Sequence, residues 1–91
     1  MDNVSDHELT TADVLFFGRL ADTLGRQRKL AIPAKGCTLG ELRRRLCETD
    51  PDAAEALNKG VRASIEREIS GDDAMVRPGQ EVAFFPIFSG G

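Results

Sequence analysis

The sequence predicts an α+β fold in which one main amphipathic helix packs across one face of a mixed β-sheet. Three observations lead to this prediction. Short apolar runs stand near both ends of the chain, VLFFG at 14–18 and EVAFF at 81–85. Between them, residues 38–48 have helical periodicity and a helix-start signal. Strand-like runs flank this helix on both sides. The first and last strands are the most apolar, so we expect them to be central, adjacent and parallel.

The composition limits the classes of function. The 91 residues provide one domain, and their 41% hydrophobic fraction is sufficient for a globular core. A net charge of −3 argues against a nucleic-acid or membrane-surface partner. The polar, acidic start lacks the basic and apolar regions of a secretory signal, and no apolar run reaches the ~18 residues of a membrane span. We therefore expect a cytoplasmic protein.

We expect three parts along the chain. Residues 1–12 form a polar N-terminal extension, residues 13–85 form the folded domain, and residues 86–91 form a flexible C-terminal tail. The sequence contains no repeat or low-complexity linker that would divide the domain.

The first elements form a hairpin with a widened loop. The apolar run 14–18 is typical of a strand buried on both faces. The following RLADTLG makes one or two helical turns that stop at Gly25, a typical residue after a helix end. A second short strand is predicted over 29–32, because Pro33 cannot donate a hydrogen bond to a sheet.

The main helix begins at a capping box. Thr38 can accept a hydrogen bond from the third backbone N–H of the helix, while the Glu41 side chain reaches back to the Thr38 N–H. Apolar side chains then recur on one face at helical spacing. They are Leu39, Leu42, Leu46 and Cys47.

Three consecutive arginines, Arg43 to Arg45, form a basic cluster on this helix. Spacings of four residues predict ion pairs of Glu41 with Arg45 and of Arg44 with Glu48. We favour a solvated helix face over an anion-binding site.

Cap and turn residues mark two further boundaries. Asp50 is the predicted N-cap of a second helix, with Pro51 at its first position and Gly60 at its end. The sequence RPGQ predicts a type II turn centred on Pro78 and Gly79, which leads into the last strand.

The segment 61–70 alternates like a strand, but Arg67 interrupts the alternation and Ile69 resumes it. The pattern therefore predicts a turn or bulge near Glu66–Arg67. With these elements the helix, sheet and connections form a β-grasp arrangement.

Catalytic and metal-binding patterns are weak. Cys37 and Cys47 match no zinc or redox spacing, and His7 is the only histidine of the sequence. We interpret both cysteines as reduced, partly buried thiols. Paired carboxylates could serve in acid–base catalysis, but no apolar pocket frame surrounds them. These pairs are Glu66 with Glu68 and Asp72 with Asp73. The sequence therefore predicts no catalytic centre, no metal site and no bound cofactor.

The sheet has two faces, and one helix can cover only one of them. Side chains alternate along a strand, so Val14 and Phe16 point to one face of the sheet and Phe17 points to the other. Phe84 and Phe85 point to different faces for the same reason. One face must then present large apolar side chains, Phe17 and Phe85 among them, to water or to a partner. We favour a protein partner, although loops or the second helix could cover this face.

The chain ends on a slender tail. Pro86 should end the sheet, and Phe88 can anchor the path that follows. Ser89, Gly90 and Gly91 carry almost no side chain, so the tail can enter a slot too narrow for larger residues. A glycyl carboxylate that another protein activates as an acyl phosphate or acyl adenylate is open to attack by an amine or a sulfur nucleophile, because glycine hinders that attack least.

Two segments resemble a known family. VLFFGRLADTLG at 14–25 and GQEVAFFPIFSGG at 79–91, with the capped helix between them, resemble the small subunit of molybdopterin synthase. This subunit is the MoaD-like sulfur carrier of the ubiquitin-like β-grasp family. The resemblance covers 13–91. The terminal diglycine is shared with other ubiquitin-like proteins, whereas the VLFF and EVAFFP runs are more specific.

The resemblance implies a function and its residues. Gly91 is adenylated by an E1-like activating enzyme that uses ATP, and it becomes a C-terminal thiocarboxylate. The tail then enters the large, MoaE-like synthase subunit, where sulfur is transferred to cyclic pyranopterin monophosphate to form the molybdopterin dithiolene. Phe17, Ile69 and Phe85 form the apolar docking surface. The implied assembly is a hetero-tetramer of two small and two large subunits, and the residues that bind the pterin belong to the large subunit.

Three alternatives remain open. The chain could be a sulfur carrier for thiamine thiazole synthesis, a protein modifier that forms isopeptide bonds through Gly91, or an interaction domain whose glycines are incidental. The sequence also departs from the family at IERE, where relatives often carry Asn in a tight turn. Glu66 and Arg67 are poorly suited to positive φ angles.

Overall fold

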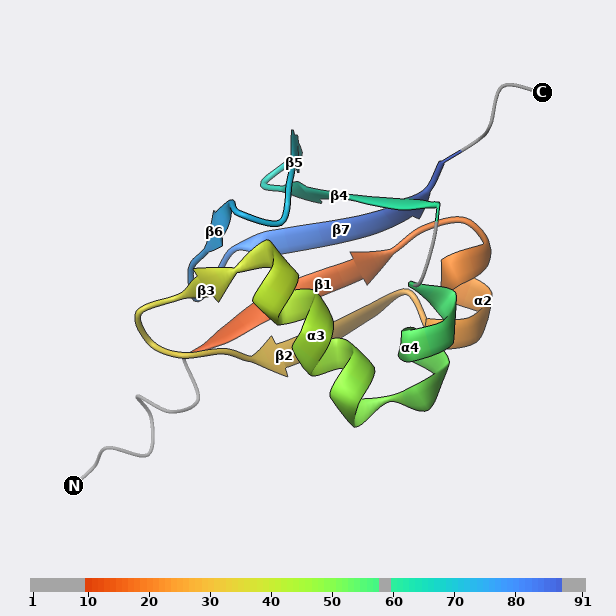
Figure 1. The fold of residues 1–91 in the computed structure, drawn as a ribbon, viewed down its shortest axis with the longest axis horizontal. Helices are drawn as coiled ribbons and strands as arrows, with labels where there is room; N and C mark the ends of the chain where they lie inside the picture. The colour runs from red at the N-terminus through yellow and green to blue at the C-terminus, as the bar shows by residue number, and fades with distance from the viewer. Residues whose placement is uncertain (1–9, 58–59, 88–91) are drawn as a thin grey trace.

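The computed structural model describes residues 10–57 and 60–87, and all structural statements below refer to these residues. Figure 1 shows the arrangement of the elements. The helices are α2 (Arg19–Leu24), α3 (Leu39–Thr49) and α4 (Pro51–Ala56). The strands are β1 (Thr11–Phe16), β2 (Gln27–Ala31), β3 (Cys37–Thr38), β4 (Val61–Ile65), β5 (Glu68–Ser70), β6 (Met75–Val76) and β7 (Glu81–Pro86).

Five of the described strands form one mixed sheet in the order β2-β1-β7-β4-β5. The first and last strands, β1 and β7, are adjacent and parallel, with Asp13 opposite Glu81 and Phe16 opposite Phe84. All other pairs in this sheet are antiparallel. Helix α3 crosses one face of the sheet, and α2 and α4 lie together at one end (Figure 1). The predicted α+β, β-grasp fold is confirmed.

Strand β1 begins earlier than the sequence indicated. Thr11 pairs with Ala31, and the Ile32 N–H donates to the Thr10 carbonyl at 3.0 Å. Ala12 is fully buried. The folded part therefore starts before the boundary predicted at residue 13. A small buried alanine between polar neighbours gives no strong hydrophobic signal, which is why the sequence placed the start too late.

The predicted hairpin of the first two strands is confirmed, with α2 in its widened loop and Gly25 after the helix at φ 86°. Strand β2 runs over Gln27–Ala31 and not over 29–32. Its first residue pairs with Leu15. Polar residues can pair in an edge strand, since pairing there depends on backbone hydrogen bonds and not on apolar side chains.

Helix α3 begins as predicted. The Thr38 Oγ1 atom accepts a hydrogen bond from the Glu41 N–H at 3.1 Å, which satisfies one of the free donors of the first turn. The Glu41 carboxylate instead forms ion pairs along the helix, and the predicted pair with Arg45 is observed at 3.3 Å.

The other two arginines of the basic cluster also form ion pairs with carboxylates. Arg43 lies 3.1 Å from Asp72, and Arg44 pairs with Glu41. Glu48 was predicted as the partner of Arg44, and this prediction was wrong. Arg44 pairs with Glu41 because Glu41 lies three residues earlier on the same helix face. Glu41 and Asp72 together pair with all three arginines, which favours a helix face with ion pairs over an anion-binding site.

Asp50 joins α3 to α4 and caps the second helix as predicted. Its Oδ1 atom accepts from the Asp52 N–H at 2.9 Å, and Pro51 occupies the first turn of α4. Arg28 bridges Asp50, at 3.1 Å, and the Leu24 carbonyl, at 3.0 Å. Burial opposes ionisation of Asp50, but the hydrogen bond from Asp52 and the contact with Arg28 outweigh it and hold the pKa of Asp50 below its ordinary value.

The turn predicted near Glu66–Arg67 is confirmed. Ile65 pairs with Glu68, so Glu66 and Arg67 alone make the connection between β4 and β5. Their φ angles are 50° and 73°, in the left-handed region that a two-residue hairpin turn requires. The chain therefore uses a tight turn with two residues that rarely adopt this conformation.

The remaining connection contains a strand pair that the sequence did not predict. Strands β3 and β6 pair antiparallel through Cys37 and Val76 beside the N-terminus of α3. The predicted type II turn follows, with Gly79 at φ 89° and the Gln80 N–H donating to the Arg77 carbonyl at 3.1 Å.

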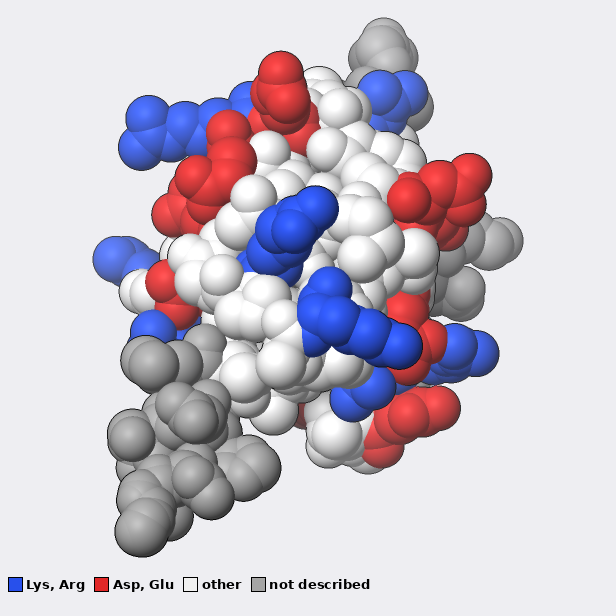
Figure 2. Space-filling model, turned by 90° about the vertical axis from the view of Figure 1, so that its left-hand side faces the viewer, with Lys and Arg blue, Asp and Glu red and all other residues white. Residues whose placement is uncertain are grey.

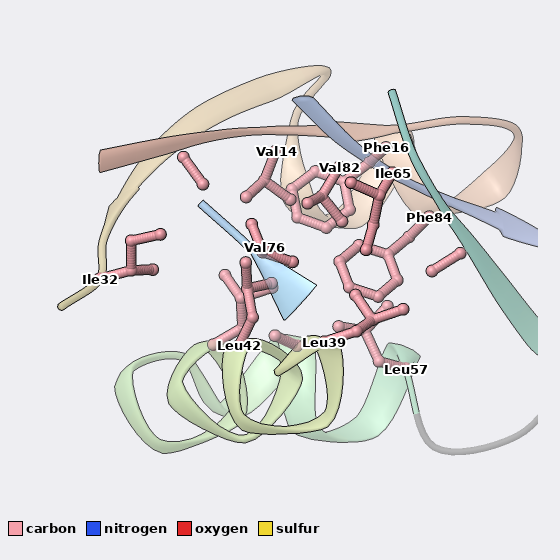
Figure 3. Packing of buried hydrophobic residues seen from close by; sticks show 14 of the residues in the cluster. Val14, Phe16, Ile32, Leu39, Leu42, Leu57, Ile65, Val76, Val82 and Phe84 are labelled. Carbon is pink, nitrogen blue, oxygen red and sulfur yellow. The ribbon is translucent and has the colours of Figure 1, made fainter. Parts of the chain in front are cut away.

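The core lies between the sheet and the helices. Figure 3 shows side chains of β1, β4 and β7 pointing toward Leu39 and Leu42 of α3 and toward Leu57, directly after α4. The largest fully buried side chains are Phe16, Phe84, Leu20, Leu39, Leu42, Leu46, Val14, Val76 and Val82. The rings of Phe16 and Phe84 stack with centroids 6.0 Å apart. Only one face of the sheet contributes to this core, which leaves the opposite face to define the candidate site.

Candidate functional site

The two central strands present a second, outer set of apolar side chains. Alternation directs Phe16 and Phe84 into the core, while Phe17, directly after β1, and Phe85, in β7, face away from α3. Phe17 is 51% exposed, and Phe85 is half-buried. Alternation therefore assigned the strand faces correctly, but the prediction that the first strand is buried on both faces was wrong, because only every second residue of β1 is buried.

Ile69 joins these aromatic side chains from another strand. It pairs with Ser64 across β4 and β5, which places it on the outer face, where it is 65% exposed. Continuing the alternation of β4 would have placed Ile69 on the core side. The two-residue turn reverses the strand, so that Ile69 shares a face with Ser64 and not with Ile65.

These residues line one shallow hollow of about 460 Å³ on the outer face of the sheet. We call it the outer hollow, and its lining is Phe17, Ser64, Arg67, Ile69, Ala83 and Phe85. The structure thus brings together Phe17, Ile69 and Phe85, which lie far apart in the sequence. A concave apolar surface of this kind is typical of a protein-binding site.

The outer hollow borders the start of the predicted tail. Pro86 is the last residue of β7 and pairs with Val61, and the Ile87 N–H donates to the Gly60 carbonyl at 2.7 Å. Sheet pairing thus extends to Pro86, the first residue of the predicted tail. The other predicted tail residues lie outside the described part of the chain. They are Phe88, Ser89, Gly90 and Gly91.

Sequence reasoning missed a role for Gly18. This residue follows β1 at φ 60°, and a Cβ atom built on it would lie 3.1 Å from the Pro86 Cγ atom. The backbone of Gly18 therefore packs closely against the end of β7. The signal in the sequence was a glycine directly after an apolar strand.

Sequence reasoning also missed Arg67 as a residue of the outer hollow. The turn that holds Arg67 is attached to β7 by two hydrogen bonds. The Glu66 N–H donates to the Glu81 carbonyl at 2.9 Å, and the Glu81 N–H donates to the Glu66 Oε2 atom at 2.7 Å. The signal in the sequence was that Glu66 and Arg67, which are poorly suited to positive φ angles, stand at a predicted turn.

Site chemistry was considered in the sequence for the two cysteines and for potential metal ligands. Burial raises the pKa of the Cys37 thiol and of the Cys47 thiol, so both are poor nucleophiles near neutral pH. Both cysteines are free. Within residues 10–57 and 60–87, no cluster of three potential metal ligands is found, and none of the helices has the length and apolar character to cross a membrane.

The end of the molecule opposite α2 and α4 carries surface charges of both signs. Figure 2 views the end that carries β3 and β6, far from α2 and α4 in Figure 1. Basic side chains lie across the middle of this end, and acidic side chains lie around its edges, so both signs occur close together. That end therefore presents no single-sign surface of the kind that a polyanion would need.

The structure resembles several solved proteins. SAMP1 from Haloferax volcanii superposes with a TM-score of 0.76 at 20% identity, covering 89% of this chain and 99% of that chain. A structure of H. volcanii small archaeal modifier protein 1 gives 0.73 at 19% identity, with 87% and 99% covered. A Pyrococcus furiosus protein, described as a candidate for molybdopterin converting factor, subunit 1, gives 0.74 at 16% identity, with 87% and 99% covered.

At these identities the structural similarity establishes the fold alone. No curated protein sequence matches the chain. The sequence does match the ThiS family over residues 14–91, which include both apolar strands, the capped helix and the terminal glycines. The chain therefore belongs to the ThiS family, which comprises small ubiquitin-like sulfur carriers.

Proposed function

We propose that this chain is the sulfur carrier subunit of a molybdopterin synthase. The observation that carries the proposal is the position of the outer hollow. It lies against the end of β7, so a partner bound to Phe17, Ile69 and Phe85 would hold the segment that leads to Gly91. Family membership over residues 14–91 and the resemblance of VLFF and EVAFFP to the molybdopterin branch support this assignment.

The proposed chemistry takes place at the Gly91 carboxylate and is performed by other proteins. The carboxylate attacks the α-phosphorus of ATP in an E1-like activating enzyme, which releases pyrophosphate and leaves a glycyl adenylate. A sulfur nucleophile then attacks the glycyl carbonyl, and AMP leaves. When the nucleophile is the outer sulfur of a persulfide on the sulfur donor, this step forms an acyl disulfide, and a thiol reductant cleaves its S–S bond to leave a thiocarboxylate on the tail. Its sulfur is donated to cyclic pyranopterin monophosphate in the large, MoaE-like subunit.

The carrier itself contributes binding and presentation. It needs no bound cofactor or metal, because ATP is used by the activating enzyme and the pterin is held by the large subunit. The apolar side chains of the outer hollow provide the contact area for docking. We propose a cytoplasmic hetero-tetramer in which each large subunit receives one tail.

The test is an intact-mass measurement. Incubation with the activating enzyme, ATP and a sulfur donor should increase the mass of the chain by the difference between one sulfur and one oxygen atom. A variant with one residue added after Gly91 should gain nothing. An unchanged wild-type mass, with an activating enzyme verified on another carrier, contradicts the proposal. The mass of the protein from its own cells also checks that Gly91 is its terminal residue.

A second candidate is a protein modifier. The similarity to SAMP1 and to small archaeal modifier protein 1 is the specific observation that favours it. Isolation of the chain linked through Gly91 to lysines of other proteins would support this function. A carrier for thiamine thiazole synthesis is the third candidate, and co-purification with a thiazole synthase in place of a molybdopterin synthase subunit would identify it.

A further inference from the structure

We propose that Arg67 determines partner specificity in the outer hollow by pairing with a carboxylate of the large synthase subunit. The inference rests on the proposed function and adds the chemistry of the partner surface. The first observation is the backbone conformation of the turn. Arg67 has a φ angle of 73°, and Glu66, the other residue of the turn, has a φ angle of 50°. Residues with a Cβ atom rarely adopt such angles, so this conformation needs a compensating benefit.

The turn is held in place by contacts that do not involve the Arg67 side chain. Glu66 forms two hydrogen bonds with Glu81, one through its backbone N–H and one through its carboxylate. Ile65 and Glu68 close the hairpin on the other side. These contacts fix the turn at the start of β7 and thereby fix the position from which the Arg67 side chain extends along the outer hollow.

The Arg67 guanidinium has no ion pair or hydrogen bond among the described residues, although it lines the outer hollow beside Ile69. Arg62 has no such partner either, and it lies opposite Phe85 on the same outer face. This contrasts with the arginines of α3, each of which has a carboxylate partner. Two unpaired cations thus border an apolar surface in a chain with a net charge of −3.

The charge distribution identifies the chemistry of the occupant. A partner that covers the outer hollow removes water from Arg67, and a guanidinium buried without an acceptor destabilises the complex. A carboxylate matches the planar guanidinium through two parallel hydrogen bonds. The occupant is therefore a protein surface with an apolar projection for Phe17 and Ile69 and an Asp or Glu beside it. A partner with Lys or Arg at that place is repelled, and this gives specificity.

The experiment compares binding of four variants to the purified large subunit by titration calorimetry. Arg67→Glu should weaken binding about tenfold or more, and the loss should shrink at high salt because the interaction is between charges. Arg77→Glu makes the same charge change at an exposed arginine outside the hollow and should alter binding less than about twofold. Arg67→Lys keeps the charge and should retain most of the affinity.

Arg67→Gly separates the functional role from a structural one. Glycine adopts φ 73° without strain, so this variant should melt about 2–4 °C higher than the wild type while it binds more weakly. A lower melting temperature, or unchanged binding, overturns the inference.

Charge exchange identifies the partner residue. One Asp→Lys or Glu→Lys substitution on the docking surface of the large subunit should restore binding of Arg67→Glu. If the wild type binds but Arg67→Glu and Arg77→Glu bind equally well, the inference fails and the proposed function stands. If the wild type binds no large subunit and gains no sulfur, both fail.

Discussion

Gly18 follows β1 directly and lies beside Pro86 at the end of β7, so a side chain at Gly18 would crowd the Pro86 ring. A Cβ atom on Gly18 would lie 3.1 Å from the Pro86 Cγ atom and 3.3 Å from its Cδ atom. The Phe17 N–H also donates to the Phe84 carbonyl at 3.0 Å, so the strands remain paired up to this contact. The absence of a side chain at Gly18 thus allows the end of β1 to pack against the end of β7.

Gly18→Ala should lower the free energy of unfolding by about 2 kcal/mol or more, because it adds a steric conflict with Pro86 to the cost of a positive φ. Gly60→Ala is the comparison variant without that contact. Gly60 has a similar φ of 67°, but a Cβ atom there would meet nothing within 4 Å, so the variant should lose only about 1 kcal/mol. Urea denaturation measures both, and equal losses would contradict the role of the Pro86 contact.

Phe85→Lys should leave the fold intact and abolish binding to the large subunit, since Phe85 lies on the outer face of β7. The adjacent Phe84 provides the contrast, because it is fully buried and stacks on Phe16. Phe84→Ala should destabilise the protein by ~3–5 kcal/mol. Circular dichroism during thermal melting, combined with a pull-down by the large subunit, distinguishes the two effects. A Phe85→Lys protein that does not fold would show that its side chain is required for the core.

Thr38→Ala should cost about 1 kcal/mol of stability, since it removes the acceptor for the Glu41 N–H at the start of α3. Thr38→Ser retains the hydroxyl and should restore most of the loss. The midpoint of urea unfolding reports both changes. If the serine variant is as unstable as the alanine variant, the methyl group and not the cap is responsible.

The loss of folding stability at low pH should depend on Asp50. The pKa of Asp50 is lowered in the folded protein from an ordinary value of 3.8, so its stabilisation is present above that value and is lost as the pH falls below it. The Arg44 contact lowers the pKa of Glu41 from 4.5 in the same direction. Stability should therefore decline below about pH 4.5.

Asp50→Asn retains a capping oxygen but does not titrate, so its stability should decline less steeply than that of the wild type below pH 4. Asp73→Asn, at an exposed turn residue, provides the control for a general loss of charge. Melting temperatures across this pH range measure the difference. If the melting temperatures of the wild type and Asp50→Asn fall in parallel as the pH decreases, ionisation of Asp50 does not stabilise the protein through the Arg28–Asp50 contact.

The sequence predicted those features of the fold that depend on strong local signals. Phe16 and Phe84 marked the central strands, Thr38 and Asp50 marked the helix starts, and Gly79 marked the turn before β7. In each case one residue type is strongly favoured by the local geometry. The outer position of Phe17 followed from alternation alone.

Other features depend on contacts between distant segments. The start of β1 at Thr11 is set by pairing with Ala31, and Gly18 is required by the ring of Pro86. The position of Ile69 depends on the length of the turn at Glu66–Arg67, since one more residue there would direct it to the other face. Local patterns contain no information on such contacts, which is why Arg67 was recognised as unusual but not as part of the outer hollow.

The parallel pairing of β1 with β7 has a consequence for synthesis of the protein on the ribosome. β1 and β2 emerge first, but the sheet stays incomplete until β7 inserts between β1 and β4. Because these contacts join the first and last strands of the sheet, most of the domain must be synthesised before it can reach its native topology. Under the proposed function, recognition by an activating enzyme would then require the folded domain, because truncated or unfolded products lack the assembled sheet surface.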